Sequence, residues 1–259
     1  MVAIYYNELG NLGHLGNQMF QYASLQGIAY NRGFDWKIPH RDFFGMKYPS
    51  IRSKIYDCFY LDLEIDSHIG INYDIPSVFE DSHGFNSELF NNCNDDVNLS
   101  GYFQSYRYFD SIKNKIKRDF TFKTRMLNLN KRENTVAIHV RRTDYLGLSE
   151  YHTNLSEEYY AAALDTVAPF KNAIVFSDDI EWCRSFSLFK GFDFVHTDPY
   201  EDLKLMTLCD RHILANSTFG WWGAYLSDTE SVVAPKDWFG PALPDHDPSG
   251  YFLPDWNII

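Results

Sequence analysis

The sequence predicts an α/β protein whose C-terminal half is a doubly wound parallel sheet. Three observations support this fold class. Between residues 134 and 234, short apolar runs alternate with helical patterns, as in successive strand–helix units. The 259 residues are enough for one or two domains. No window of about 18 residues lacks charges and polar clusters, so no transmembrane segment is expected.

The N-terminal half begins with a predicted strand and a long predicted helix. The apolar run at residues 2–6 is typical of a buried strand, and a glycine-containing turn follows it. A helix is expected at residues 17–32, with Gly33 as its C-cap. The apolar face of this helix is predicted to comprise Phe20, Ala23, Gly27 and Tyr30.

The rest of the N-terminal half is less regular. Residues 34–96 show no sustained period and are left unassigned. Residues 97–104 are expected to form a second strand and residues 106–117 a second helix. The lysine and arginine residues near the end of this helix are interpreted as a solvated helix face.

The C-terminal half has a regular pattern. Ser156 is predicted to cap a helix whose first turn carries Glu157 and Glu158, where the helix dipole favours acidic residues. Its buried stripe is predicted to be Tyr160, Ala163, Leu164 and Val167. Strands are predicted at residues 135–140, 173–176, 192–195, 212–215 and 231–234. Further helices are predicted at residues 180–186, 201–210 and 219–226.

These patterns divide the chain into three segments. Residues 1–125 are predicted to form one domain and residues 126–238 a second. Residues 239–259 contain several prolines and are expected to form an irregular tail that packs back on the surface.

Composition excludes some functions. The net charge of −12 argues against nucleic-acid binding, which requires clustered lysine and arginine. The aromatic content of 17% indicates either an aromatic-rich core or a surface that stacks on sugars or bases. The four cysteines form no CxxC pair, and no signal-peptide pattern begins the chain, so a cytoplasmic protein with free buried thiols is expected.

Polar residues follow four of the predicted strands. The carboxyl ends of parallel strands meet at one edge, where ligands bind in open α/β sheets. Two arginines could neutralise phosphate there, and the N-terminus of the helix at 219–226 favours an anion. The set therefore suits a nucleotide diphosphate, although simple helix caps and salt bridges would also explain it. Its members are Arg141, Arg142, Thr143, Asp144, Ser177, Asp178, Asp179, His196, Asp198, Asn216, Ser217 and Thr218.

The predicted loop at residues 141–155 also carries possible proton acceptors. Loops of this length inside a compact domain are usually functional. Glu150 and His152 both lie on it. His139 stands at the end of the preceding strand, where it is either a ligand-binding residue or a hydrogen-bonded core imidazole.

Several ordered segments carry a family resemblance. They are GHLGNQMFQYA (residues 13–23), GYFQSYRYF (101–109), HVRRTDY (139–145), FSDD (176–179) and DLKLMTLCDRHILANSTFGWWGAYL (202–226). Together they resemble the motifs of the α-1,2-fucosyltransferases of glycosyltransferase family 11. The resemblance implies a GT-B-like fold of two facing Rossmann-like domains, with acceptor on the N-terminal side and GDP-fucose on the C-terminal side.

The same resemblance implies an activity. The enzyme would transfer L-fucose from GDP-β-L-fucose to the 2-hydroxyl of a galactose in a glycan, with inversion and without a metal or other cofactor. The alternatives are the same fold using another GDP-sugar, and a glycan-binding module whose catalytic site has decayed.

Roles for individual residues follow from the matched motifs. Arg142, with Arg141 as second choice, would hold the β-phosphate, and Asp144 would orient the two arginines. Among Glu150, His152 and Asp144, Glu150 is favoured as the general base. The residues implied in donor binding are Asn17, Gln18, His139, Asp178, Asp179, Asp202, Asn216, Ser217 and Thr218.

Overall fold

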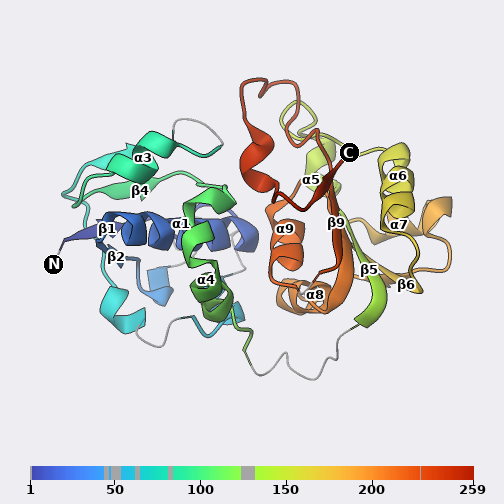
Figure 1. The fold of residues 1–259 in the computed structure, drawn as a ribbon, viewed down its shortest axis with the longest axis horizontal. Coiled ribbons are helices and arrows are strands. Elements are labelled where there is room, and N and C mark those ends of the chain that lie inside the picture. The colour runs from blue at the N-terminus through green and yellow to red at the C-terminus, as the bar shows by residue number, and fades with distance from the viewer. Residues whose placement is uncertain are drawn as a thin grey trace. The chain divides into compact units, whose positions relative to one another are not determined.

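The protein forms two α/β units, each built on its own parallel sheet (Figure 1). The computed structural model describes residues 2–43, 47, 54–61, 65–80, 84–123, 132–227 and 229–259. Unit 1 comprises Met1–Arg125 with Ser249–Tyr251, and unit 2 comprises Met126–Pro248 with Phe252–Ile259. The predicted α/β class is therefore correct.

Unit 1 contains a four-stranded sheet in the order β2-β1-β4-β3, with every pairing parallel. The strand predicted at 97–104 is much shorter, because the backbone leaves the extended conformation at Gly101 and Phe103, whose φ angles are 151° and 51°. The Glu80 carboxylate accepts hydrogen bonds from the backbone N–H groups of Tyr102 and Phe103. The strands are β1 (Ala3–Tyr5), β2 (Asp35–Lys37), β3 (Ser77–Phe79) and β4 (Asn98–Ser100).

The long helix α1 (Leu15–Arg32) ends as predicted at Gly33, which has a left-handed φ of 70°. Gly27 lies against the backbone of Tyr108, since a Cβ added there would be 1.9 Å from the Tyr108 carbonyl oxygen. The prediction for Tyr30 is wrong, because this side chain is 67% exposed. Helix α1 is buried around most of its circumference, so its sequence carries little amphipathic signal.

The other helical segments of unit 1 are short. The helix predicted at residues 106–117 is split into two 3₁₀ turns and a short α-helix. The α-helices are α2 (Ile55–Cys58), α3 (Ser87–Asn92) and α4 (Lys113–Asp119). The 3₁₀ helices are η1 (Arg41–Phe43), η2 (Ile65–His68), η3 (Tyr106–Tyr108) and η4 (Asp110–Ile112).

Unit 2 contains a six-stranded parallel sheet in the order β10-β9-β8-β5-β6-β7. Side chains alternate along β5, so Val136 and Ile138 join one apolar cluster and Ala137 joins another. The sheet is thus covered on both faces, as the doubly wound prediction requires. The strands are β5 (Arg132–Val140), β6 (Asn172–Ser177), β7 (Asp193–Val195), β8 (Cys209–Ile213), β9 (Ser231–Ala234) and β10 (Asn257–Ile258).

The helices of unit 2 lie near their predicted positions. The Ser156 side chain caps α6 by accepting a hydrogen bond from the Tyr159 N–H, as predicted. The helix predicted at 201–210 ends earlier, because Asp210 belongs to β8 and its carboxylate accepts from the N–H groups of Asn134 and Thr135. The helices are α5 (Thr143–Leu146), α6 (Glu157–Val167), α7 (Ile180–Ser185), η6 (Ser187–Phe189), α8 (Pro199–Met206) and α9 (Thr218–Tyr225).

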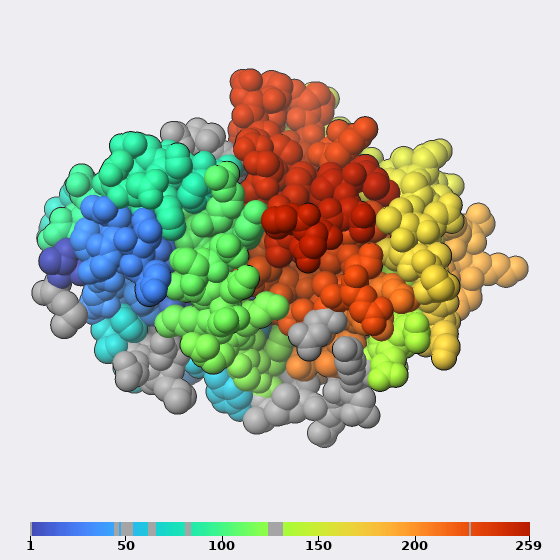
Figure 2. Space-filling view, viewed as in Figure 1, coloured from blue at the N-terminus to red at the C-terminus, as the bar shows by residue number. Residues whose placement is uncertain are grey.

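The segment at residues 239–259 is more ordered than predicted. It contains η7 (Pro248–Tyr251) and the edge strand β10, which pairs in parallel with β9. Trp256 packs against Trp221 of α9, with 5.7 Å between ring centroids. In Figure 2 the dark red atoms of the last residues lie at the surface of unit 2 beside the yellow atoms of α6.

Two sequence expectations concern the whole chain. Each of the four cysteines lies within the described residues, is buried and has a free thiol, as predicted. None of the described helices has the length and apolarity needed to cross a bilayer.

Candidate functional site

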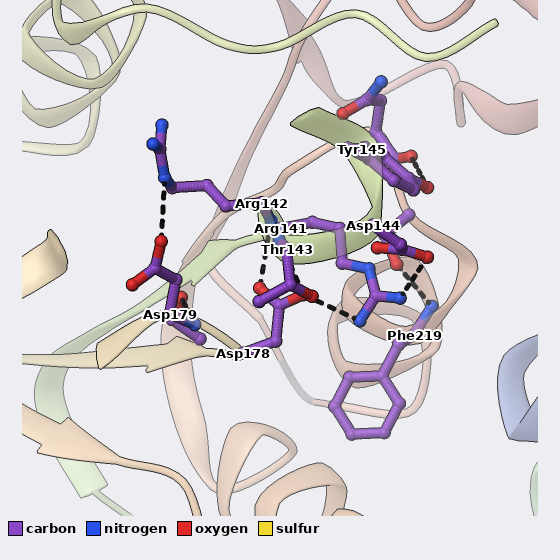
Figure 3. A network of polar contacts seen from close by, with 11 residues as sticks. Arg141, Arg142, Thr143, Asp144, Tyr145, Asp178, Asp179 and Phe219 are labelled. Atoms are coloured by element: carbon purple, nitrogen blue, oxygen red, sulfur yellow. Dashed lines mark hydrogen bonds and ion pairs between the residues drawn. The ribbon is translucent and has the colours of Figure 1, made fainter. Parts of the chain in front are cut away.

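Three neighbouring strands of unit 2 deliver polar residues to one rim (Figure 3). Strand β5 pairs with β6 on one side and β8 on the other, so the residues after these strands lie close together. Arg141 and Arg142 follow β5, and Asp178 and Asp179 follow β6. Ser217 lies between β8 and α9.

Asp178 organises the start of the loop at 141–155. Its carboxylate accepts from the backbone N–H groups of Arg142 at 2.9 Å and Thr143 at 3.2 Å, and from the Thr143 hydroxyl. It also forms an ion pair with Arg141 at 3.1 Å. Burial alone would raise the pKa of Asp178, but hydrogen bonds from Thr143 and the charge of Arg141 hold it below its ordinary value. Asp178 thus anchors the loop rather than presenting a free carboxylate.

The two arginines point to opposite sides of the rim, as Figure 3 shows. The Arg142 guanidinium lies over the Trp182 ring, 3.9 Å from its centroid, and its Nε is 3.3 Å from Asp179. The Arg141 guanidinium instead pairs with Asp144 at 2.8 Å and lies 5.5 Å from the Tyr145 ring centroid.

The N-terminus of α9 lies on the Arg141 side. Tyr145, whose ring centroid lies 5.5 Å from the Arg141 guanidinium, donates a hydrogen bond of 3.1 Å from its hydroxyl to the carbonyl oxygen of Asn216. Ser217 is the N-cap of α9, and its hydroxyl oxygen accepts from the Phe219 N–H at 3.4 Å. A helix N-terminus beside a guanidinium favours an anionic group.

The Asn216 side chain hydrogen-bonds two segments that pack against this turn. Its side chain is 2% exposed, and its amide nitrogen donates to the carbonyl oxygens of Thr153 at 3.1 Å and Trp238 at 2.8 Å. The amide therefore ties the loop at 141–155 and the segment after β9 to the turn before α9. The structure gives Asn216 this positioning role, and it does not present the amide nitrogen to a ligand.

His139 lies beneath α9 and is 6% exposed. A Cβ added at Gly220 would be 2.6 Å from its Nδ1, and its ring centroid lies 5.8 Å from that of Phe219. Burial lowers the pKa of His139 to about 4; the charge of Arg141 acts in the same direction and Asp178 opposes it. Nδ1 has no hydrogen-bond partner among the described residues. The ring is therefore buried, but Nδ1 lacks the hydrogen bond that a core imidazole would be expected to make, and the role of His139 in donor binding stays a prediction.

Asp202 is also a buried residue, 7% exposed, on α8. Its carboxylate accepts from the backbone N–H of Thr197 at 3.2 Å and from the Thr197 hydroxyl at 2.7 Å. Burial raises the pKa of Asp202 above its ordinary value, although the bonds from Thr197 oppose this shift. Its interactions hold the segment that follows β7.

The remaining predicted donor contacts, Asn17 and Gln18, belong to α1 of unit 1 and not to this rim. The half-buried Asn17 accepts a hydrogen bond of 2.9 Å from the Gln104 amide. Gln18 is fully buried; it donates to the carbonyl of Gly13 and accepts from the Ile55 N–H, each at 3.2 Å. The placement of Gln18 therefore gives no support to a donor contact.

Two aromatic features were not predicted. Trp182 supports Arg142, and Tyr145 stacks on His152 with ring centroids 4.1 Å apart and an angle of 7°. A tryptophan in the first turn of a helix after the Asp178 strand end was an available signal for the first contact. The stack joins Tyr145 in the short helix α5 to a residue seven positions later, beyond the end of that helix, where no periodicity predicts a contact.

Among the described residues, no group of three or more His, Cys, Asp and Glu side chains is arranged to hold a metal ion. The charged groups that the rim offers to an anion are Arg141 and Arg142, with the N-terminus of α9 beside Arg141.

Comparisons with known proteins agree with the motifs. A family model described as glycosyl transferase family 11 matches residues 4–259. An "Alpha-1,2-colitosyltransferase" from Escherichia coli is 32% identical over 270 residues, covering 88% of this chain and 90% of that protein. A "Galactoside alpha-(1,2)-fucosyltransferase 1" from Alouatta belzebul is 29% identical, covering 94% of this chain and 72% of that protein.

Solved structures with the same fold include two fucosyltransferases. NodZ from Bradyrhizobium matches with a TM-score of 0.55 and 11% identity, covering 87% of this chain and 92% of that chain. POFUT1 in complex with GDP-fucose matches with a TM-score of 0.51 and 12% identity, covering 89% and 96% of the two chains. At such identities the likeness shows the fold alone, and it confirms the predicted α/β fold of GT-B type.

Proposed function

The chain belongs to glycosyltransferase family 11, and from this premise we propose that it is an inverting α-1,2-fucosyltransferase. It transfers L-fucose from GDP-β-L-fucose to the 2-hydroxyl of a galactose in a glycan. Its similarity to α-1,2-fucosyltransferases and an α-1,2-colitosyltransferase supports the linkage. In this proposal unit 2 binds the donor and unit 1 binds the acceptor.

The observation that carries the donor assignment is the position of Arg141 beside the N-terminus of α9. The leaving group of the reaction is a diphosphate, on which negative charge grows as the sugar departs. A guanidinium and the partial positive charge of a helix N-terminus stabilise such charge without rearranging. Arg141 can exchange its exposed partner Asp144 for a phosphate oxygen, since that carboxylate is half accessible to solvent.

Arg142 has a supporting role in this proposal. Its guanidinium is held between Trp182 and Asp179, and its backbone N–H is held by Asp178. These contacts fix the backbone from which Arg141 extends. The phosphate ligand is therefore Arg141, which the motif alone ranked second, and Arg142 positions it.

We propose that the reaction needs no metal ion. The phosphate charge is met by Arg141 and by the N-terminus of α9. Transfer should therefore continue when a chelator such as EDTA is present. Loss of activity with EDTA, and its recovery with Mg²⁺ or Mn²⁺, would contradict this part of the proposal.

The similarity to an α-1,2-colitosyltransferase favours one alternative donor. A GDP-linked colitose would use the same diphosphate contacts, because such a donor would differ from GDP-fucose in the sugar and not in the nucleotide. The test must therefore supply both donors in parallel.

The experiment is a donor and acceptor screen that measures GDP release and the fucosylated product. With GDP-fucose, EDTA and a β-galactoside, the purified protein should release GDP and form an α-1,2-linked product. Faster turnover with the colitosyl donor would reassign the donor. Folded protein that binds a glycan but neither binds nor cleaves any GDP-sugar would instead identify a decayed, glycan-binding module.

A further inference from the structure

The proposed transfer requires a group that accepts the proton of the acceptor hydroxyl, and the carboxylates of the rim are engaged elsewhere. Asp178 holds the loop backbone and Arg141. Asp179 accepts from the Trp182 N–H at 3.2 Å as the N-cap of α7 and pairs with Arg142. Asp144 pairs with Arg141 at 2.8 Å, and once a phosphate replaces it the half-exposed carboxylate has no other hydrogen-bond or ion-pair partner among the described residues to fix its position. A carboxylate paired with a guanidinium is a weaker base than a free one.

Glu150, the base favoured from the sequence, is fully outside this network. Its side chain is exposed, and no hydrogen bond or ion pair joins its carboxylate to another described residue. Only its backbone is held, by a 2.7 Å hydrogen bond from the Ala242 N–H to its carbonyl oxygen. An exposed, unrestrained carboxylate has no defined position relative to Arg141.

His152 is held in place from three sides. Its ring stacks on Tyr145, with 4.1 Å between centroids and 7° between planes. Its backbone N–H donates to the Leu148 carbonyl oxygen at 3.0 Å, and the residue forms an antiparallel bridge with Phe239. The next residue, Thr153, donates from its hydroxyl to the Phe239 carbonyl oxygen at 2.9 Å.

The stack connects His152 to the anion side of the rim. Tyr145, the ring on which His152 stacks, donates a hydrogen bond from its hydroxyl to the Asn216 carbonyl oxygen. This bond holds Tyr145 at the turn before α9. The Arg141 guanidinium carbon lies 5.5 Å from the Tyr145 ring centroid. Tyr145 is therefore close to both the imidazole and the group that would hold the departing phosphate.

The imidazole is available as a base. It is half-buried, and no hydrogen bond or ion pair to its ring nitrogens is found in the part of the chain that the structure describes. Burial lowers the pKa of His152; Asp144 opposes this shift and Arg141 reinforces it. The stacked phenol is uncharged, because burial raises the pKa of Tyr145 to about 12. In the segment at residues 235–248, the residue that pairs with His152 is Phe239, which carries no charge.

We propose that His152 is the catalytic residue that accepts the proton of the acceptor hydroxyl. The hydroxyl oxygen forms a bond to C1 of the transferred sugar as the bond from C1 to the β-phosphate oxygen breaks. The bonding electron pair leaves with GDP, and the hydroxyl proton moves to a ring nitrogen of His152. This assignment rests on the proposed transferase function and adds a residue to it.

The test compares wild-type protein with His152→Gln in the GDP-fucose and β-galactoside assay, from pH 5 to pH 9. General-base catalysis contributes about 100-fold or more, so kcat should fall by at least that factor in the variant. In wild-type protein, kcat/KM should decline as the pH falls through a value below about 6.5, because protonated imidazole cannot accept a proton. That acidic limb should be absent from the variant.

Two further measurements separate catalysis from a structural role. Affinity for GDP, measured by calorimetry, should change less than about twofold in His152→Gln, because the diphosphate contacts remain. Added imidazole should restore part of the activity of His152→Ala, whereas a purely structural loss would not respond. His40→Gln, at an exposed position in unit 1, is the matched control and should behave as wild type.

The outcomes are distinguishable. Wild-type protein that transfers no sugar from any GDP-sugar would overturn the proposed function itself. Active wild-type protein with an equally active His152→Gln variant would overturn only the assignment of His152. A loss of activity that is independent of pH and not restored by imidazole would also overturn that assignment.

Discussion

At the scale of single residues, the two arginines of the HVRRTDY motif have different surroundings although they are adjacent in sequence. Arg142 is packed over Trp182 and paired with Asp179. Arg141 is paired with the half-accessible Asp144 and with Asp178, and lies near the turn before α9. A ligand phosphate can replace an exposed carboxylate at lower cost than it can separate a guanidinium from an aromatic ring.

This difference predicts unequal effects of two equivalent substitutions. Arg141→Gln removes a charged hydrogen-bond donor to the phosphate, so affinity for GDP should fall by about 10- to 100-fold. Arg142→Gln should lower this affinity less and should reduce thermal stability more, because it loses packing on Trp182. Titration calorimetry with GDP and thermal unfolding measure the two effects.

Arg184→Gln provides the matched control for this pair, because Arg184 lies on the exposed side of α7 and pairs with Glu181 at 3.0 Å. It should leave GDP affinity unchanged. A larger loss of affinity in Arg142→Gln than in Arg141→Gln would assign the phosphate contact to the other arginine.

At the scale of elements, a glycine allows α9 to approach the central strand β5. Gly220 is buried, and a Cβ at this position would be 2.6 Å from His139 Nδ1 and 2.9 Å from its Cγ. A side chain of β5 and the first turn of α9 thus occupy adjoining space. The position of the helix end that we propose to bind an anion depends on this close packing.

Gly220→Ala should therefore destabilise unit 2. Overpacking a dense core costs about 1–3 kcal/mol, which should appear as a lower free energy of unfolding in urea. Tryptophan fluorescence is a suitable signal, because Trp36 is in unit 1 and the other five of the six tryptophans are in unit 2. Gly147→Ala is the control, since its nearest contact would be 3.7 Å away, at the Asp144 carbonyl oxygen. Equal stability of the two variants would contradict the close approach.

At the scale of the whole molecule, unit 2 combines buried histidines with an ionised loop anchor. Burial lowers the pKa of His212 to about 4, although its bond to the Met206 carbonyl oxygen opposes the shift. His139 is similarly affected, with a pKa of about 4. The pKa of Asp178 lies below its ordinary value. Each of these groups favours the folded state less as the pH falls.

The sign of the pH dependence follows from proton binding. Between about pH 6.5 and pH 4, the unfolded chain protonates these two histidines while the folded chain keeps them neutral, so stability falls with pH. Each histidine contributes up to about 1.4 kcal/mol per pH unit in this range. The contribution of Asp178 to folding stability is lost at a lower pH than that of the histidines, as its carboxylate becomes protonated.

Urea unfolding at a series of pH values measures this dependence. The net charge of −12 decreases in magnitude over the same range, which relieves self-repulsion and acts in the opposite direction. His212→Gln isolates the histidine contribution, because it should reduce the slope relative to wild type. His40→Gln, at an exposed position, should leave the slope unchanged. A His212→Gln slope equal to that of wild type would contradict this assignment.

The sequence by itself determined the order of strands β5 to β9 and helices α6 to α9 in unit 2 and the polar residues at the strand ends, but not α5 or the edge strand β10. The stripe of Tyr160, Ala163, Leu164 and Val167 and the Ser156 cap are local signals, because a helix brings residues three or four apart onto one face. In unit 1, by contrast, α1 is buried nearly all round and the strands have only three residues each, so hydrophobic periodicity was weak there.

Only the tertiary structure decided what each polar side chain does. Asp178 and Asn216 belong to the rim by sequence position, yet their side chains hold backbone groups of segments distant in the chain. Gln18 and His139 are buried by neighbours that no local pattern specifies. The physical reason is that a strand end fixes where a residue lies, whereas the direction and the partner of its side chain depend on packing between segments far apart in sequence.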